Sequence, residues 1–243
     1  HGSYGACPRV VLEEQARLRA RIESEPVRFF VEDIEGELDR AKVRLGEFLG
    51  AQPEDLAFGT NATGGVNTVL RSLDLGPTDE LPVTYHEYNA CRNALDFVAA
   101  RSGAAVVVAH VPFPLQDPEE VVEALLAKVT DRTRLALFDH ITSATGMVMP
   151  VEELVRRLNE RGVDSLVDGA HGPGQLDLNL DELGAAYYSG NCHKWLCTPK
   201  GSAILHVRRD RQDKIRPLSI SHAANSPRRD RSRFLLEADW TGT

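Results

Sequence analysis

Cysteine is scarce in this chain of 243 residues, and long apolar runs are missing. The four cysteines, Cys7, Cys91, Cys192 and Cys197, show no spacing typical of a disulfide framework, which fits a reducing compartment. A membrane-spanning helix needs about 20 consecutive apolar residues, and no run approaches that length. The segment that begins at His1 has neither the basic nor the apolar region of a secretory signal. We therefore expect a cytoplasmic protein with no membrane partner.

Patterns typical of metal and nucleic-acid binding are also missing. Cys192, His193, Cys197 and His171 do not follow a standard zinc spacing and have a lysine among them, so we predict no metal. Residues 208–233 carry a net charge of +6, although the whole chain carries −8. No aromatic residues interleave these basic residues and no nucleic-acid motif accompanies them. We interpret the segment as a solvated, partly mobile surface and predict no nucleic-acid partner.

Short β-rich runs alternate with helical patterns along the chain. The sequence predicts strands at 56–58, 82–84, 104–111, 134–138, 164–167, 185–188 and 203–207, and helices at 62–73, 87–101, 118–129 and 150–161. The continuous apolar run 104–111 predicts a strand that is buried on both faces. Because the strands alternate with long helices, we predict an α/β fold with a mainly parallel sheet flanked by helices.

Two amphipathic helices are expected before this alternation, at 11–25 and 34–49. Phe29 and Phe30 lie between them, and we expect both to pack, either within this chain or across a dimer interface.

Reactive side chains follow two of the predicted strands. Asp168 comes directly after the run 164–167, and Lys194 comes shortly after the run that ends in Tyr187 and Tyr188. Ligands of such sheets bind beyond the carboxyl ends of the strands, where these side chains would meet. A lysine forms a Schiff base with the aldehyde of pyridoxal 5′-phosphate (PLP), and a carboxylate keeps its pyridinium nitrogen protonated. The combination predicts a PLP enzyme.

The segment 60–65 follows a strand, opens a helix and consists of small residues. Its first backbone N–H groups would favour an anion, as in a phosphate cradle. A capped helix start without a ligand explains the same pattern equally well.

Nine short segments carry a resemblance to a known family. They are residues 1–5, 26–30, 61–63, 86–88, 139–143, 167–171, 193–196, 199–201 and 239–243. In this order they resemble the class V aminotransferase family of fold-type-I PLP enzymes, and within it the isopenicillin N epimerase-like proteins. The resemblance implies the large domain of the fold-type-I transferases, with a small C-terminal domain apparently absent from this chain. It divides the chain into an N-terminal segment, 1–35, and a PLP-binding large domain, 36–243, of which 208–243 leads towards the absent domain.

The resemblance also implies roles for individual residues. Lys194 would form the Schiff base and later move the Cα proton, and Asp168 would pair with the pyridinium nitrogen. His171 would lie beside the phenolic oxygen of the ring, and Tyr88 would stack on the ring. The other implied cofactor contacts are Ala62, Thr63, Asn191 and His193 at the phosphate, Thr142 and Ser143 near the ring, and Thr243 at the phosphate of a neighbouring subunit.

A residue that reaches a neighbouring subunit implies a homodimer with shared active sites. The implied substrate is an amino acid, which reacts at Cα through an aldimine and a quinonoid. We expect an epimerase-like reaction first. A C–S lyase or cysteine desulfurase-like reaction, an aminotransferase, and a catalytically silent binding protein with this fold stay open as alternatives.

Overall fold

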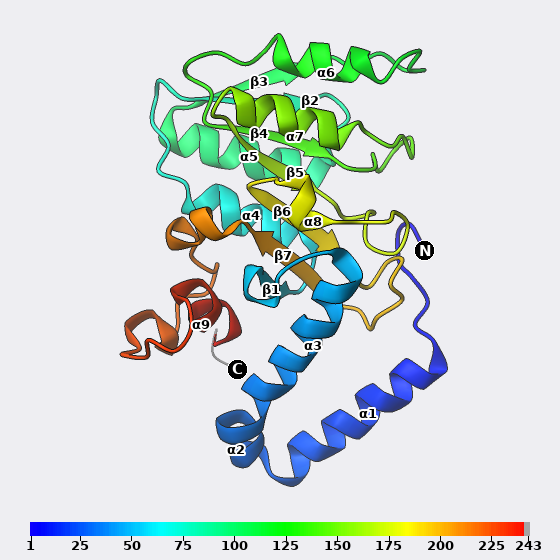
Figure 1. Ribbon diagram of the computed structural model, residues 1–243, viewed down its shortest axis with the longest axis vertical. Helices are drawn as coiled ribbons and strands as arrows, with labels where there is room; N and C mark the ends of the chain where they lie inside the picture. Colours follow the sequence, from blue (N-terminus) through cyan, green and yellow to red (C-terminus); the bar gives the residue numbers. More distant parts are fainter. Residues whose placement is uncertain (241–243) are drawn as a thin grey trace.

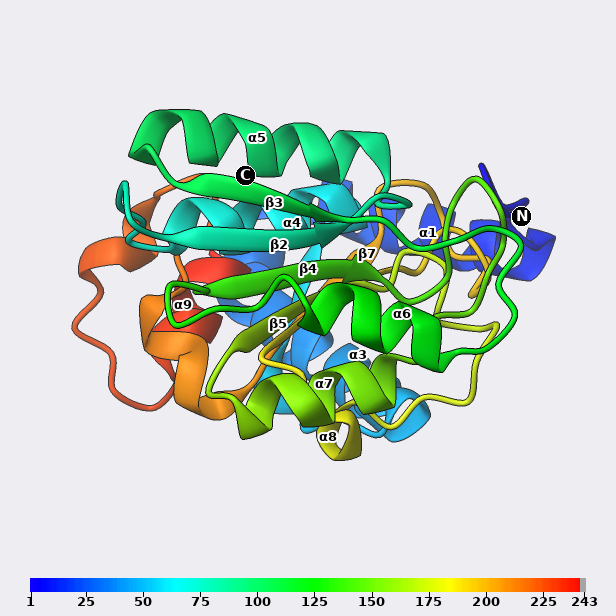
Figure 2. The same ribbon diagram turned by 90° about the horizontal axis from the view of Figure 1, so that it is seen from above.

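The computed structural model of the protein describes residues 1–240, which form a seven-stranded sheet covered by helices on both faces (Figures 1 and 2). The strands are β1 (Leu56–Gly59), β2 (Glu80–Thr84), β3 (Ala105–Ala109), β4 (Leu135–Asp139), β5 (Asp164–Asp168), β6 (Tyr187–Asn191) and β7 (Ala203–Val207). Their order in the sheet is β1-β7-β6-β5-β4-β2-β3. Strands β2 to β6 pair in parallel, whereas β7 is antiparallel to both β1 and β6. The predicted α/β fold with a mainly parallel sheet is therefore confirmed.

Two layers of helices enclose the sheet, and a hydrophobic cluster fills each interface (Figure 2). One layer holds α4 (Ala62–Ser72), α5 (Asn89–Ser102) and α9 (Arg233–Asp239); the other holds α3 (Ile34–Leu49), α6 (Glu119–Leu126), α7 (Val151–Glu160) and α8 (Leu180–Leu183). The remaining elements are α1 (Arg9–Ser24), α2 (Pro26–Arg28), the π-helix η1 (Phe29–Asp33) and the 3₁₀ helices η2 (Pro53–Asp55), η3 (Arg209–Lys214) and η4 (His222–Asn225). Within residues 1–240, none of these helices has both the length and the apolar character needed to cross a membrane.

Local sequence explains how helix α4 begins and how it lies on the sheet. The Asn61 side chain accepts a hydrogen bond from the Gly64 backbone N–H at 2.7 Å, which satisfies one of the free donors of the first turn. Gly65 faces strand β6, and a Cβ atom at this position would overlap the side chain of Ser189. The absent side chain thus lets the start of α4 approach the end of β6 closely.

The helix before the sheet shows the expected aromatic packing. Phe29 is buried, and its ring meets the ring of Phe30 edge to face with centroids 5.5 Å apart. Helix α1, in contrast, has no buried residue and lies apart from the sheet (Figure 1).

The prediction for the apolar run 104–111 was wrong about its burial. Strand β3 is an edge strand, because β2 is its one neighbour among the described residues. Ala105 is exposed and residues 106–108 are half-buried. An apolar run indicates contact with a helix layer, but it does not reveal whether strands pair on both sides. Strand β6 also begins two residues later than predicted, at Tyr187.

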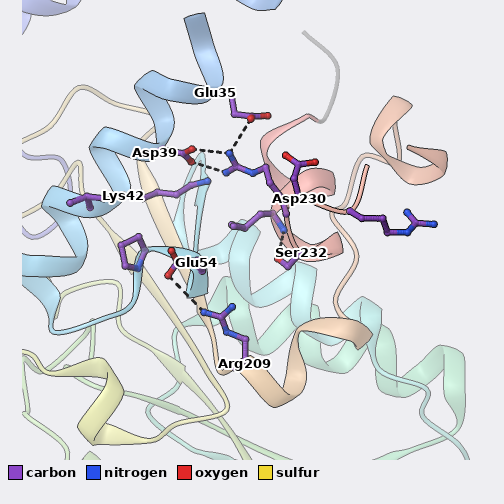
Figure 3. Close-up of a pocket in the computed structure, with 12 residues that line it drawn as sticks. Glu35, Asp39, Lys42, Glu54, Arg209, Asp230 and Ser232 are labelled. Atoms are coloured by element: carbon purple, nitrogen blue, oxygen red, sulfur yellow. Dashed lines mark hydrogen bonds and ion pairs between the residues drawn. The ribbon is translucent and has the colours of Figure 1, made fainter. Parts of the chain in front are cut away.

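The interpretation of residues 208–233 as a solvated segment was wrong for Arg231, whereas Arg228 is 38% exposed. Arg228 pairs with Glu35 at 2.6 Å, and Arg231 pairs with Asp39 at 2.7 Å. Only 11% of the Arg231 side chain is exposed. Both acids lie on α3 and point into a cleft of about 760 Å³ between α3 and the C-terminal segment (Figure 3). These arginines therefore fasten the C-terminal segment to α3.

Candidate active site

A second cleft, of about 700 Å³, lies at the carboxyl edge of the parallel strands. Three neighbouring strands end there in polar residues, β4 in Asp139, β5 in Asp168 and β6 in Asn191, and all three residues line the cleft. Eight of the predicted site residues line it: Thr63, Tyr88, Ser143, Asp168, His171, Asn191, His193 and Lys194. The larger cleft beside α3 contains none of them, and most of its lining charges form ion pairs.

The Lys194 amine is held by a network that favours its neutral form. Its Nζ lies 3.0 Å from His171 Nε2, while the indole Nε1 of Trp195 lies 3.2 Å from His171 Nδ1. An indole N–H only donates, so Nδ1 is the acceptor and the neutral ring of His171 carries its proton on Nε2. That proton then points at the lone pair of an uncharged Lys194 amine.

Burial acts in the same direction on both groups. Burial, together with the nearby Lys194, lowers the pKa of His171 to about 4. It also lowers the pKa of Lys194, an effect that Asp168 partly offsets. An uncharged amine is the nucleophilic form of lysine, so this arrangement is suited to the capture of an aldehyde.

Asp168 is buried, with 2% of its surface exposed, and two donors hold its carboxylate. The Cys91 thiol donates to Oδ2 at 3.0 Å, and the Ala170 backbone N–H donates to Oδ1 at 2.9 Å. Burial raises the pKa of Asp168, whereas the two donors and the charge of Lys194 oppose that rise. Burial also raises the pKa of Cys91, which therefore stays a thiol and keeps its proton to donate.

The predicted phosphate residues meet at the start of α4. The Ala62 backbone N–H donates to Asn191 Oδ1 at 2.9 Å, so Asn191 fixes the helix start beside β6. Ala62 itself is buried and does not line the cleft, whereas Thr63 does. His193 Nδ1 donates a hydrogen bond to the Ser202 carbonyl at 2.9 Å. The other ring nitrogen, Nε2, is then available for a ligand in the cleft. The arrangement offers polar groups to an anion beside a helix start.

The remaining predicted residues have different positions. Tyr88 directly precedes α5 at the cleft, and 44% of its surface is exposed. Ser143 lines the cleft, but Thr142 is buried and uses its hydroxyl within its own loop, where it accepts from the Met147 backbone N–H at 2.9 Å. Thr243 lies outside the described residues.

Although Asp139 and Glu87 lie in segments that carry the family resemblance, three buried residues beside Asp168 were given no role by the sequence analysis. Cys91 is its hydrogen-bond donor, Asp139 occupies the adjacent strand end, and Glu87 has a carboxylate within 4.8 Å of both Cys91 and Asp168. A usable signal existed for Asp139, because it directly follows the predicted strand 134–138, as Asp168 directly follows the predicted strand 164–167. Cys91 and Glu87 follow β2, and no local pattern indicates that they turn towards β5.

Comparison with known proteins identifies the family. The family model described as aminotransferase class-V matches residues 7–231. The chain belongs to the class V aminotransferase family. An isopenicillin N epimerase of Amycolatopsis lactamdurans is 39% identical over 240 residues, which cover 96% of this chain and 60% of that protein. An L-cysteine desulfhydrase of Arabidopsis thaliana is 29% identical over 259 residues, which cover this whole chain and 56% of that protein.

A solved structure shares the fold. The cystine C–S lyase C-DES, in complex with its reaction product cysteine persulfide, superimposes with a TM-score of 0.84 at 25% identity. The match covers 99% of this chain and 68% of that chain. This chain thus spans only about three fifths of the curated relatives. The matches confirm the predicted family and fold class, and they support the predicted cofactor, PLP.

The cleft residues fit that cofactor. The amine of Lys194, whose pKa burial lowers, suits the aldehyde, and the buried carboxylate of Asp168 suits a protonated ring nitrogen. The start of α4 and His193 suit a phosphate group.

Proposed function

We propose that this chain is the cofactor-binding part of a PLP-dependent enzyme that acts at Cα of an amino-acid substrate, with an epimerase-like reaction. The observation that carries the proposal is the position of the Lys194 amine, 3.0 Å from His171 Nε2 and in one cleft with Asp168. The similarity to isopenicillin N epimerase supports the choice of reaction.

Each group has a distinct task in this proposal. Lys194 holds the cofactor covalently and takes the proton from Cα of the substrate. Asp168 holds the proton of the ring nitrogen, and His171 orients Lys194. Tyr88 and Ser143 border the ring, while Thr63 and His193 hold the phosphate. When bound, the cofactor supplies a ring that withdraws electrons from Cα.

Borohydride reduction followed by peptide mapping tests the covalent step. Protein expressed with ample PLP should show a visible absorption band that borohydride bleaches, and the pyridoxyl group should map to Lys194. Lys200 also lines the cleft and is the natural alternative. A label on Lys200, or no label at all, contradicts the proposal.

A C–S lyase or desulfurase-like reaction is the second candidate. The similarity to an L-cysteine desulfhydrase and to the cystine C–S lyase favours it. The full-length protein should be incubated with L- and D-amino acids and with cysteine, cystine and thioethers, while chirality, keto acid and sulfide are followed together. Inversion without keto acid supports the epimerase, sulfide release supports the lyase, and keto acid without sulfide indicates a transaminase.

A homodimer with shared sites is also part of the proposal. Thr243, the residue expected to reach the phosphate of the neighbouring subunit, lies outside the described residues. The homodimer therefore rests on the family resemblance. Sedimentation at working concentration tests it, since a monomer would contradict shared sites. A cytoplasmic location stays a prediction, which localisation of the tagged full-length protein would test.

A further inference from the structure

Three buried carboxylic acids from different elements meet at the cleft, and two of them, Asp139 and Asp168, line it. Glu87 precedes α5, Asp139 ends β4 and Asp168 ends β5, and each is less than 9% exposed. Carboxylate oxygens of Glu87 and Asp168 lie within 4.8 Å of each other and of the Cys91 sulfur. Asp139 and Asp168 are direct neighbours in the register of the sheet.

The cluster has far fewer partners than three charges require. Both carboxylate oxygens of Glu87 and Oδ2 of Asp139 have no hydrogen-bond partner among the described residues. Among the described residues, the cation that acts on the cluster is Lys194, and burial lowers the pKa of its amine. Three ionised acids would leave at least two uncompensated buried charges, and such charges take up protons instead.

Hydrogen bonds decide which acid keeps the negative charge. Asp168 receives the Cys91 thiol and the Ala170 amide, and both favour its ionised form. Burial raises the pKa of Glu87 well above its ordinary value, and the charges of Asp139 and Asp168 raise it further. Burial and Asp168 raise the pKa of Asp139 in the same way. The Tyr88 backbone N–H lies near both carboxyls without forming a hydrogen bond to them, and it opposes both rises less strongly than burial causes them.

We propose that Glu87 is a positioning residue that stays protonated and thereby keeps the negative charge of the cluster on Asp168. This inference rests on the proposed function, because Asp168 is the carboxylate expected to meet the ring nitrogen of the cofactor. A neutral Glu87 does not compete for that proton. An ionised Glu87 would raise the pKa of Asp168 and shift the proton from the ring to the carboxylate.

Unfolding of the cofactor-free protein tests the protonation of Glu87 by itself. When the pKa of a group is raised in the folded state, the protein loses stability as the pH rises above the ordinary pKa of that group, which is 4.5 for Glu87. Glu87→Gln removes this titration, so the stability of the variant relative to the wild type should increase between pH 5 and 8. The expected gain is up to about tenfold in the folding equilibrium constant per pH unit. Glu13→Gln, on the exposed face of α1, is the matched control. If the two variants respond equally to pH, Glu87 is ionised and the proposal fails.

The visible band of the bound cofactor tests the positioning role. Glu87→Gln stays neutral and keeps polar hydrogens, so the band should titrate as in the wild type. Glu87→Leu is neutral as well, so its band should also titrate as in the wild type. A shift of about one pH unit or more in both variants would show that the wild-type Glu87 is charged, which would overturn the positioning role. A wild type without any visible band would instead contradict the proposed function, while the unfolding measurement would still decide the protonation of Glu87.

Discussion

Acidic residues on α3 and acidic residues at the carboxyl edge of the sheet have opposite electrostatic surroundings. Asp39 faces Arg231 in a bidentate pair, and the hydrogen bond from this arginine lowers the pKa of the carboxyl. Glu87 and Asp139 face other acids, and burial raises the pKa of each. Paired charges hold the C-terminal segment in place, whereas unbalanced charges cost stability and are typical of sites that perform chemistry.

Among the variants, removal of the Lys194 amine should have the largest effect on turnover. Lys194→Ala deletes the covalent attachment and the base, so turnover should fall by several orders of magnitude. The variant should also lose the borohydride-sensitive band, which absorption spectroscopy measures. Its thermal unfolding should stay close to that of the wild type, because Lys194 lies at a cleft and its pKa is lowered by burial. Retained turnover would remove Lys194 from the reaction.

Loss of the charge on Asp168 should cause the second-largest fall in turnover. Asp168→Asn preserves the shape of the side chain but no longer holds a proton on the ring nitrogen. We expect a fall in kcat of about 100-fold, comparable to the loss of one key electrostatic group. Steady-state kinetics with matched cofactor occupancy measures it. An unchanged kcat would show that another group protonates the ring.

Loss of the ion pair between Arg231 and Asp39 should lower the free energy of unfolding and leave the cofactor site intact. Arg231→Met removes the ion pair of this arginine with Asp39 and its ion pair with Asp239. Because the arginine is nearly buried and Asp39 is half-exposed, we expect a loss of about 2 kcal/mol, between the values for buried and surface pairs. Chemical denaturation measures it, with Arg44→Met as the exposed control. A drop in cofactor binding without a loss of stability would place Arg231 in the site instead.

The indole of Trp195 should make a smaller contribution. Trp195→Phe removes the donor that fixes the proton of His171 on Nε2. The rate of cofactor capture by the cofactor-free protein should fall by about 5- to 10-fold, the value of one hydrogen bond. Stopped-flow absorbance measures that rate. If the rate is unchanged, His171 keeps its orientation through Lys194 alone.

The smallest effect concerns the pH dependence of the Asp39 pair. The pKa of Asp39 is lowered in the folded state, so its contribution exists above the ordinary value of 3.8 and is lost as the pH falls through the folded-state value. Asp39→Asn should therefore cost up to about 1 kcal/mol at pH 7 and less at pH 3, which lies below the ordinary value. Unfolding curves at the two pH values provide the measurement, and an equal cost at both would rule out the charge as the cause.

Local patterns determined most of the fold. The apolar positions Val151, Leu154, Val155 and Leu158 recur at helical spacing, and all of them are buried on α7. The alternation of strands and helices predicts the parallel sheet, because each helix returns the chain to the same edge. The same rule places Asp168 and Lys194 together, since both follow strand ends and so meet at one cleft.

Tertiary structure alone decided which side chains are partners. The position of β3 at the sheet edge depends on strand order, which an apolar run does not encode. Lys42 pairs with Asp239 across 197 positions, and Cys91 donates to Asp168 across 77. Such pairs bring together segments that are distant in the chain, so neither residue carries a local signal of the other. The sequence by itself determined which groups were available for chemistry, and only the fold decided which of their charges were left unbalanced.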